Sequence, residues 1–450
     1  MDFITSLCHR YCVCCLGDSM NKENIQKEWE QIVSLENLRK IYDEHTIKSN
    51  ASGVDNITGK EYSKRIEEEI KFINKKLVCQ QYRFSKYKIS YILKGVQEPR
   101  IICIPTQRDK IVAYAIVLLL NNLFEKVAKT LLPQTLIAEI SEHIQSFSCG
   151  IKLDLHDFYG SIDHDILFYK LQDKIKDEYI LNLIRQAIDI DRRVSSSGEN
   201  QGVPQGLSFS NALANIYLTE IDQKYRAIKD ACYVRYVDDI ILLSNNQEYF
   251  DCLKSDLKEI KLKLNEEKEH RIQTKINSFY FIGYEFKDGI VRIRDEGIKK
   301  VINSLDRIIR KNRSNINAMF FKLNIRITGL IWGNKKYGWM FYYSQTQDLS
   351  QLFFMDRVLR TKLFPRYGIK EDTIYKIKRF VRVYWEIRKS LHNSNYVLNV
   401  DKVSAKEKSE TIKTILRDNK EHTQKEIDEL YFQVITREIT DMEKDVQNIS

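Results

Sequence analysis

Three aspartates stand where apolar stretches end, and their type and spacing suggest metal chemistry. Asp154 follows an apolar run that begins at Ile151, and Asp238 and Asp239 lie between the apolar runs 232–236 and 240–243. Ionised carboxylates clustered at strand ends repel one another and are rarely kept without a compensating cation. Mg²⁺ prefers oxygen ligands and usually leaves part of its shell to substrate phosphates. These residues therefore suggest a two-ion site, with the ions about 4 Å apart, for nucleotidyl transfer.

Each acidic stretch taken alone has an ordinary explanation, because a pair of aspartates between two strands is also a common turn. The 84-residue offset between Asp154 and Asp238 leaves room for a helix-containing crossover that would lay the two strands side by side. Residues 201–208 lie between them and contain a Gly–Pro–Gly turn that lets the backbone approach another body, while Gln205 offers amide groups. The combination favours a functional site.

The elements that must position these residues are a mixture of strands and helices. The sequence predicts a β-hairpin from 87–94 and 100–104, an apolar helix over 109–126 and a buried strand over 149–155. A helix capped by Ser208 and a strand–turn–strand over 232–244 follow, then a small hairpin over 279–286 and 290–293. After Glu296 the pattern is helical to the end of the sequence. The predicted fold class is α+β.

Positive charge is concentrated in one region of the chain. Residues 299–400 contain 21 Lys and Arg against 6 Asp and Glu, a net of +15, whereas residues 401–450 contain 9 against 12, a net of −3. Aromatic residues alternate with this charge, among them Tyr337, Trp339, Phe341, Tyr342, Tyr343, Tyr384 and Trp385. A charge run alone is more often a solvated helical face, but basic residues interleaved with aromatic ones favour a nucleic-acid surface.

Composition limits the remaining possibilities. The 450 residues are 43% apolar, which is enough for a core and for two or three substructures. The sequence has no run of about 18 apolar residues and no secretory leader, so we expect a cytoplasmic protein without a membrane partner. Cys8, Cys12, Cys14 and Cys15 crowd the N-terminus beside His9 in a spacing that fits no zinc pattern. We interpret them as small apolar residues of a short helix.

Taken in order, these motifs resemble the reverse transcriptases of bacteria, which are related to those of group II introns. The resemblance covers about residues 50–345 and rests on SGVDNIT (52–58), PRIICIPTQRDKIV (99–112), KLDLHDFYGSIDH (152–164), QGVPQGLSFSNALANIYL (201–218), RYVDDIIL (235–242), LKLNEEKEHRI (262–272), FYFIGYEF (279–286) and NIRITGLIWGNKKYGWMFYY (324–343). It implies a right-hand polymerase with fingers and palm followed by an all-helical thumb and a helical C-terminal region. The expected domains are an N-terminal helical segment (1–50), fingers and palm (51–295), a basic thumb (296–400) and a charged tail (401–450).

The resemblance implies a catalytic role for the three aspartates. Asp154 and Asp238 match the residues that ligate both metal ions, and Asp239 completes the acidic cluster. The cofactor implied is a pair of Mg²⁺ ions, for which Mn²⁺ could substitute.

The resemblance also implies the residues that bind the incoming nucleotide. Arg100 and Arg108 match the arginines that pair with its triphosphate, a contact suited to the bidentate guanidinium group. Lys268 would lie near the same triphosphate, Tyr159 under the sugar, and Gln205 near the new base pair.

The resemblance implies an RNA-directed DNA polymerase that makes cDNA from dNTPs on an RNA template. An RNA-dependent RNA polymerase resembles this pattern but has Asp where this chain has Tyr159, whose ring would exclude a ribose 2′-OH. A maturase-like, non-catalytic RNA-binding scaffold would not need the aspartates, arginines and glutamine together.

Within this family, the sequence most resembles the stand-alone bacterial enzymes of anti-phage defence and abortive infection. A partner non-coding RNA commonly supplies the template there, and a homo-oligomer is possible. A retron-type or group II intron-type enzyme is the alternative.

Overall fold

The computed structural model describes residues 22–47, 49, 51–92, 99–124, 131–189, 200–333, 335–369, 371–417, 420 and 422–446. The N-terminal cysteines named above lie outside these residues. The chain divides into two compact units, the first made of Met1–Leu131 and Gly150–Arg271 and the second of Leu132–Cys149 and Ile272–Ser450. Among the described residues, none of the helices combines the length and apolar character needed to cross a membrane. The domain boundaries expected from the sequence stay a prediction.

The first unit begins with helices and a β-hairpin. Its helices are α2 (Lys22–Ile32), α3 (Leu35–Ile41), α4 (Gly59–Tyr62), α5 (Ile66–Val78) and α6 (Gln107–Leu123). Strands β1 (Lys88–Ile92) and β2 (Arg100–Ile104) pair antiparallel, with Lys88 opposite Ile104. This confirms the predicted hairpin. Pro105 ends the second strand, and the Thr106 hydroxyl then accepts the Asp109 N–H to cap α6.

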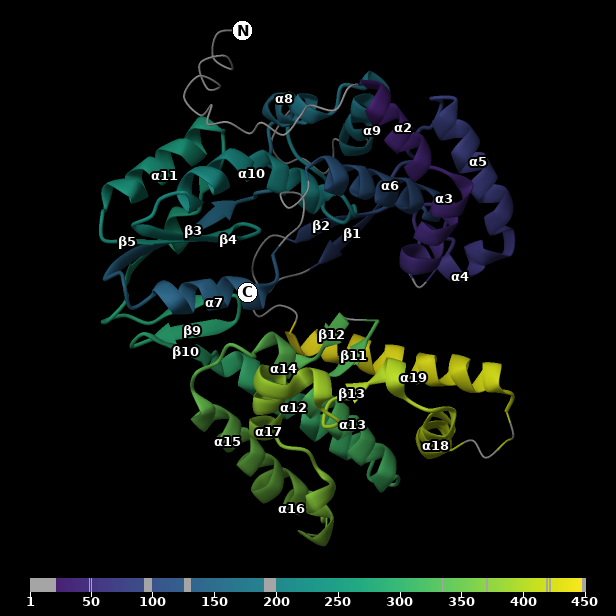
Figure 1. Cartoon of the computed structure of the whole chain (residues 1–450), viewed down its shortest axis with the longest axis vertical. Helices are drawn as coiled ribbons and strands as arrows, with labels where there is room; N and C mark the ends of the chain where they lie inside the picture. The colour runs from purple at the N-terminus through teal and green to yellow at the C-terminus, as the bar shows by residue number, and fades with distance from the viewer. Residues whose placement is uncertain are drawn as a thin grey trace. The chain divides into compact units, whose positions relative to one another are not determined.

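The second part of this unit is a sheet covered by helices. The strand order is β4 (Ala231–Tyr236), β5 (Asp239–Ser244), β3 (Cys149–His156) and β6 (Lys263–Leu264), and β7 (His270–Gln273) also pairs with β3. The run Ile240–Leu243 of β5 is fully buried, because elements cover both faces of the strand. The helices are α8 (His164–Lys174), α9 (Glu178–Asp189), α10 (Ser210–Arg226) and α11 (Glu248–Glu259), of which α10 and α11 lie along one face of the sheet (Figure 1).

The start of α10 differs from the prediction. The helix begins at Ser210 with Phe209 at its N-cap, a residue that offers no side-chain oxygen, so Ser208 is not the cap. The Ser210 hydroxyl instead donates to the Pro204 carbonyl oxygen at 2.7 Å. This bond fixes the loop that precedes the helix.

The second unit combines a small meander with many helices. Strands β8 (Phe279–Phe281), β9 (Tyr284–Lys287) and β10 (Ile290–Ile293) form an antiparallel sheet where the sequence predicts a hairpin. The helices are α7 (Pro133–His143), α12 (Asp295–Lys311), α13 (Ile316–Thr328), α14 (Trp339–Tyr342), α15 (Leu349–Val358), α16 (Phe364–Arg366), α17 (Phe380–Trp385), α18 (Ala405–Leu416) and α19 (Gln424–Val446).

The region expected to be all-helical also contains a small sheet. Strand β11 (Leu330–Trp332) lies between β12 (Lys335–Tyr337), to which it is antiparallel, and β13 (Leu398–Asn399), to which it is parallel. Gly329 ends α13 with a φ of +67°, and a Cβ at this position would overlap the Tyr337 carbonyl oxygen. The helix therefore stops there, and the β-forming residues Ile331 and Trp332 continue as a strand.

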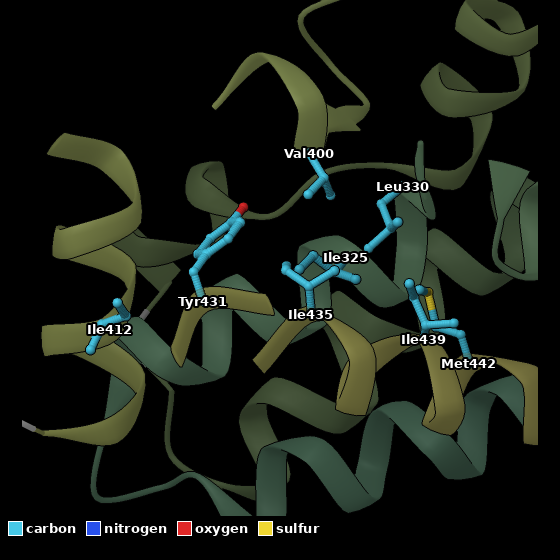
Figure 2. Close-up of a cluster of buried hydrophobic side chains, with 8 residues drawn as sticks. All are labelled: Ile325, Leu330, Val400, Ile412, Tyr431, Ile435, Ile439 and Met442. Carbon is cyan, nitrogen blue, oxygen red and sulfur yellow. The ribbon is translucent and has the colours of Figure 1, made fainter. Parts of the chain in front are cut away.

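The C-terminal helix is part of the core of the second unit. Figure 2 shows Tyr431, Ile435, Ile439 and Met442, which lie on one face of α19 and pack with four residues from the rest of the unit: Ile325, Leu330, Val400 and Ile412. Their spacing of three or four residues is the helical period of a buried face. The segment whose charge suggests a tail thus supplies apolar side chains to the core.

This packing predicts that the last helix stabilises the second unit. Ile435→Ala should lower the free energy of unfolding by about 2–5 kcal/mol, because it removes buried methyl groups and leaves a cavity. Gln433→Ala, at an exposed position of the same helix, should change it by less than about 0.5 kcal/mol. Chemical denaturation of the whole chain measures both, and a loss for Ile435→Ala as small as for the control would contradict the packing.

Candidate active site

Strand pairing brings the three aspartates together. The antiparallel register of β3 with β5 places Asp154 opposite Asp239, and the Leu155 N–H donates to the Asp238 carbonyl oxygen at 3.1 Å. Two acidic stretches far apart in the sequence therefore meet at one end of the sheet. The sequence predicted this side-by-side arrangement of the two strands.

The turn that carries Asp238 has a strained backbone. Tyr236 pairs with Asp239, so that Val237 and Asp238 are the two residues of the turn between β4 and β5. Val237 has a φ of +57°, a conformation that glycine adopts readily and a β-branched residue adopts at a cost. Strain of this kind persists only where the surroundings hold the backbone in place.

A buried arginine supplies that support. Arg235 on β4 is 8% exposed, and its Nη1 donates to the Val237 carbonyl oxygen at 3.0 Å. Its Nε donates to Asp222 on α10 at 2.8 Å, and its Nη2 pairs with the second oxygen of that carboxylate. Asn215, also on α10, accepts from Arg235 at 3.3 Å. A charge buried in this way is tolerated because it is paired and hydrogen-bonded, and here it ties the acidic turn to α10.

This contact between Arg235 and Asp222 is not among those expected from the sequence. The signal available was a charged residue within an apolar strand, since Arg235 lies between Val234 and Tyr236 of β4, two residues before Val237, and is buried. A single sequence does not show which helix supplies the partner, so Asp222 could not have been predicted.

The electrostatics of the site reflect crowded carboxylates. Burial raises the pKa of Asp238 above its ordinary value, and the neighbouring charges of Asp239 and Asp154 raise it further. Burial also raises the pKa of Asp239, an effect that the ammonium group of Lys152 partly offsets and the charge of Asp154 reinforces. Ionisation of Asp238 and Asp239 therefore brings repelling carboxylates close together, which costs free energy in the folded chain.

Lysines partly neutralise the cluster. The Lys268 Nζ donates to Asp154 Oδ2 at 3.0 Å, and the Lys152 Nζ lies 3.3 Å from Asp239 Oδ1. Asn265 also donates to Asp154, at 3.4 Å. Within the residues that the structure describes, no group of three or more His, Cys, Asp and Glu side chains is gathered as a metal site. The donor chemistry still suits a hard cation, because carboxylate oxygens at this end of the sheet attract ammonium groups, and the charge of Asp154 raises the pKa of Asp238 and Asp239.

Arg100 and Tyr159 lie beside the aspartates. Arg100 stands at the exposed start of β2, and its charge acts to lower the pKa of Asp238. The Tyr159 hydroxyl donates to the side-chain oxygen of Asn211 on α10. Burial, together with the charge of Asp238, raises the pKa of Tyr159 to about 12, so its hydroxyl is neutral at physiological pH. Asn211 is not among the site residues expected from the sequence.

The loop that carries Gln205 is docked against both neighbouring segments. The Cys103 N–H of β2 donates to the Gln205 carbonyl oxygen at 2.7 Å, and the Val203 N–H donates to the Tyr159 carbonyl oxygen at 2.8 Å. Gly206 has a φ of +108°, and a Cβ there would overlap the Cys103 carbonyl oxygen. The close approach that the Gly–Pro–Gly pattern predicts is therefore made to β2 of the β1–β2 hairpin.

Arg108 is engaged elsewhere in the described structure. Its Nε donates to Glu69 on α5 at 2.9 Å, and its guanidinium carbon lies 4.4 Å from the centroid of the Phe72 ring. Glu69 is buried and Arg108 half-buried, so this pair links α5 with α6. The structure thus gathers the aspartates, Arg100, Tyr159, the Gln205 loop and Lys268, and gives Arg108 a partner within the helices.

Comparison with known proteins shows which family these features resemble. Residues 92–286 match the family described as reverse transcriptase (RNA-dependent DNA polymerase). This confirms the resemblance noted from the sequence and the α+β class with fingers and palm.

Three proteins illustrate the similarity. Protein YkfC of Escherichia coli is 24% identical over 340 residues, which are 63% of this chain and 87% of that protein. An uncharacterized 91 kDa protein in a cob intron of Schizosaccharomyces pombe is 26% identical over 34% of this chain, and the match spans only 20% of that protein. The structure of Candida albicans telomerase with a fragment of telomeric RNA superposes with a TM-score of 0.43 at 15% identity, covering 87% of this chain and 71% of that one.

The crowded carboxylates predict a pH-dependent stability. The pKa of Asp238 lies above its ordinary value of 3.8 in the folded chain, so ionisation costs stability as the pH rises through the raised pKa. Without divalent metal, Asp238→Asn should therefore raise the free energy of unfolding by on the order of 1 kcal/mol at neutral pH, and the gain should shrink as the pH falls towards 4. Thermal unfolding in chelator across this range measures the difference.

The matched control is Asp251→Asn, which removes an exposed carboxylate from α11 in the same unit. It should leave the stability nearly unchanged at every pH. Asp238→Asn being less stable than the wild type at neutral pH would contradict the electrostatic account.

Proposed function

We infer from the reverse transcriptase domain of residues 92–286 that this chain is an RNA-directed DNA polymerase. The single observation that carries the proposal is the β3–β5 register, which sets Asp154 opposite Asp239 and next to Asp238. In this assignment residues 51–295 supply fingers and palm, residues 296–400 the thumb, and residues 401–450 the charged C-terminal segment.

The three aspartates would hold two Mg²⁺ ions, with Mn²⁺ as a substitute. Such ions neutralise charge on the attacking and leaving oxygens of nucleotidyl transfer. Lys268 and Lys152 lie against Asp154 and Asp239 and offset part of the negative charge of these carboxylates. With the aspartates holding metal ions, Lys268 would be available to contact the phosphates of the incoming nucleotide.

The remaining site residues would select and position a dNTP. Arg100 is exposed beside the acidic cluster and presents a fork suited to phosphate oxygens, whereas Arg108 would first have to leave Glu69. The Tyr159 ring is held in place through its hydroxyl bond to Asn211, so it would clash with the 2′-OH of a ribonucleotide. The docked Gln205 loop would lie under the new base pair.

We further propose that the template belongs to a specific structured non-coding RNA and that the cDNA serves anti-phage defence in the cytoplasm. The net charge of +15 over residues 299–400 supports a phosphate-binding surface larger than a short template–primer duplex requires. The resemblance to stand-alone bacterial enzymes supports the defence role. A retron-type or intron-type enzyme is the alternative, and sequencing the RNA and cDNA that copurify with the chain distinguishes them.

The catalytic assignment predicts the effect of removing the carboxylates. The double variant Asp238→Ala/Asp239→Ala should stay folded and lose dNTP incorporation on a primed RNA template, because the metal ligands are gone. The control Glu248→Ala/Asp251→Ala removes two carboxylates from the neighbouring α11 and should retain full activity. Primer extension and circular dichroism of each variant provide the test. Undiminished incorporation by the folded double variant would overturn the proposed function.

Sugar selection provides a second prediction. Tyr159→Val should raise the kcat/KM for rNTP relative to that for dNTP by on the order of 10- to 100-fold, since the clash with the 2′-OH is relieved. Tyr159→Phe keeps the ring and loses only the hydroxyl that donates to Asn211, so it should leave the ratio nearly unchanged. A ratio that is the same in all three proteins would assign Tyr159 to packing alone.

A further inference from the structure

A groove on the second unit combines exposed aromatic and cationic side chains. It lies between α15, α17 and the π-helical segment Glu386–Ser390 that continues α17, and has a volume of about 450 Å³. Its lining residues include Phe353, Arg379, Arg382, Trp385, Glu386 and Lys389. All of these residues belong to the basic region identified in the sequence. The volume lies within the range of small-ligand sites, about 300–1,000 Å³.

The walls of the groove are firmly anchored. The buried Asp356 of α15 accepts the Phe380 N–H at 2.8 Å, which caps α17 and fixes it against α15. Phe380 and Val383 are fully buried, and the Phe380 ring packs edge-on against Trp339 at a centroid distance of 5.8 Å. Because one face of α17 is held in the core, the position of its opposite face is set.

That opposite face is unusual in being both apolar and basic. Arg382, Trp385 and Lys389 are three and four residues apart, so they lie on one side of α17 and the helical segment that continues it. Trp385 is 42% exposed and Phe353, on α15, is 52% exposed. Side chains of this size are usually well buried, so two of them lining one groove suggest a surface that a partner covers.

The charges in the groove favour an anionic, planar partner. The Lys389 Nζ lies 4.6 Å from the centroid of the Trp385 ring, while Arg382 lies 3.4 Å from the one acidic residue of the lining, Glu386. The lining thus holds three cations and one carboxylate, and Arg379 also lies 3.7 Å from the buried Asp356 behind it. An unpaired nucleotide satisfies both features, because its base stacks on an aromatic ring and its phosphates pair with the cations.

We propose that this groove binds an unpaired nucleotide of a single-stranded nucleic acid. Its base stacks on Trp385 beside Phe353, and Arg379, Arg382 and Lys389 hold the flanking phosphates. Bases within a duplex are already stacked and do not enter the groove. The proposal rests on the proposed function and deepens it, since it gives the basic region a specific contact with unpaired nucleic acid in addition to general attraction for phosphate.

The test is the affinity of the whole chain for labelled single strands of about 12 nucleotides, measured by fluorescence anisotropy without dNTPs. Trp385→Ala should weaken binding about tenfold and Phe353→Ala should weaken it as well, while binding of a duplex of the same sequence is unchanged. Trp385→Phe keeps a stacking surface and should restore most of the affinity. Tyr169→Ala, which removes a 44% exposed aromatic residue from α8, is the matched control and should have no effect.

Strands of RNA and of DNA are tested in parallel, and a Trp385-dependent loss for either supports the proposal and identifies which of them occupies the groove. An equal loss for single strand and duplex, or no loss in either aromatic variant whose thermal stability is intact, overturns it. Displacement of the single strand by polyglutamate that depends on Trp385 also overturns it, in favour of an acidic peptide.

The outcome is separable from that of the proposed function. A wild-type chain that binds single strands through Trp385 without incorporating dNTPs contradicts the polymerase assignment alone. A chain that incorporates dNTPs but binds independently of Trp385 and Phe353 contradicts this inference alone.

Discussion

Repulsion among Asp154, Asp238 and Asp239 is the constraint around which the first unit is organised. The ladder between β3 and β5 forces Asp154 opposite Asp239, and burial together with neighbouring charge raises the pKa of Asp238 and Asp239. Because ionising these carboxylates so close together costs free energy, the arrangement persists only if the rest of the fold stabilises it. Its cost is offset by the fully buried run Ile240–Leu243 of β5 and by the helices packed on the sheet.

Several contacts make sense only in the light of that constraint. The Arg235 side chain joins the strained Val237 turn to α10, and so fixes the backbone of Asp238 without placing a positive charge on its carboxylate. The ammonium groups of Lys152 and Lys268 instead pair directly with the carboxylates of Asp239 and Asp154, respectively. Asp163, from the same acidic motif as Asp154, has a structural role instead, because it caps α8 through the Ile166 N–H at 3.1 Å and pairs with Lys261. The motif therefore divides into residues that could bind metal and residues that hold the helix behind them.

Sequence reasoning reached the elements whose signal is local. The apolar runs around Asp154 and Asp238 predicted both strands and the turn, and the break at Pro99 and Pro105 predicted the β1–β2 hairpin. It failed where a residue's partner lies far along the chain. Nothing near Arg235 indicates its partner Asp222, and nothing near Arg108 indicates its partner Glu69. The parallel pairing of Leu330 with Leu398 joins two segments that the sequence pattern predicts to be helical. The burial of α19 was likewise hidden, since its apolar stripe is surrounded by charged residues on the exposed face.

The central claim, that the three aspartates are kept close together to bind a divalent cation, is tested most directly by titrating the chain with Mn²⁺ and following the free ion by electron paramagnetic resonance. The account predicts that the wild-type protein depletes the signal of free Mn²⁺, and that Asp154→Asn, which keeps the shape of the side chain but loses its charge, binds the ion much more weakly. Exposed carboxylates removed from α11 should leave the titration unchanged. Equal Mn²⁺ binding by the wild type and Asp154→Asn, or no binding by either, would contradict the account.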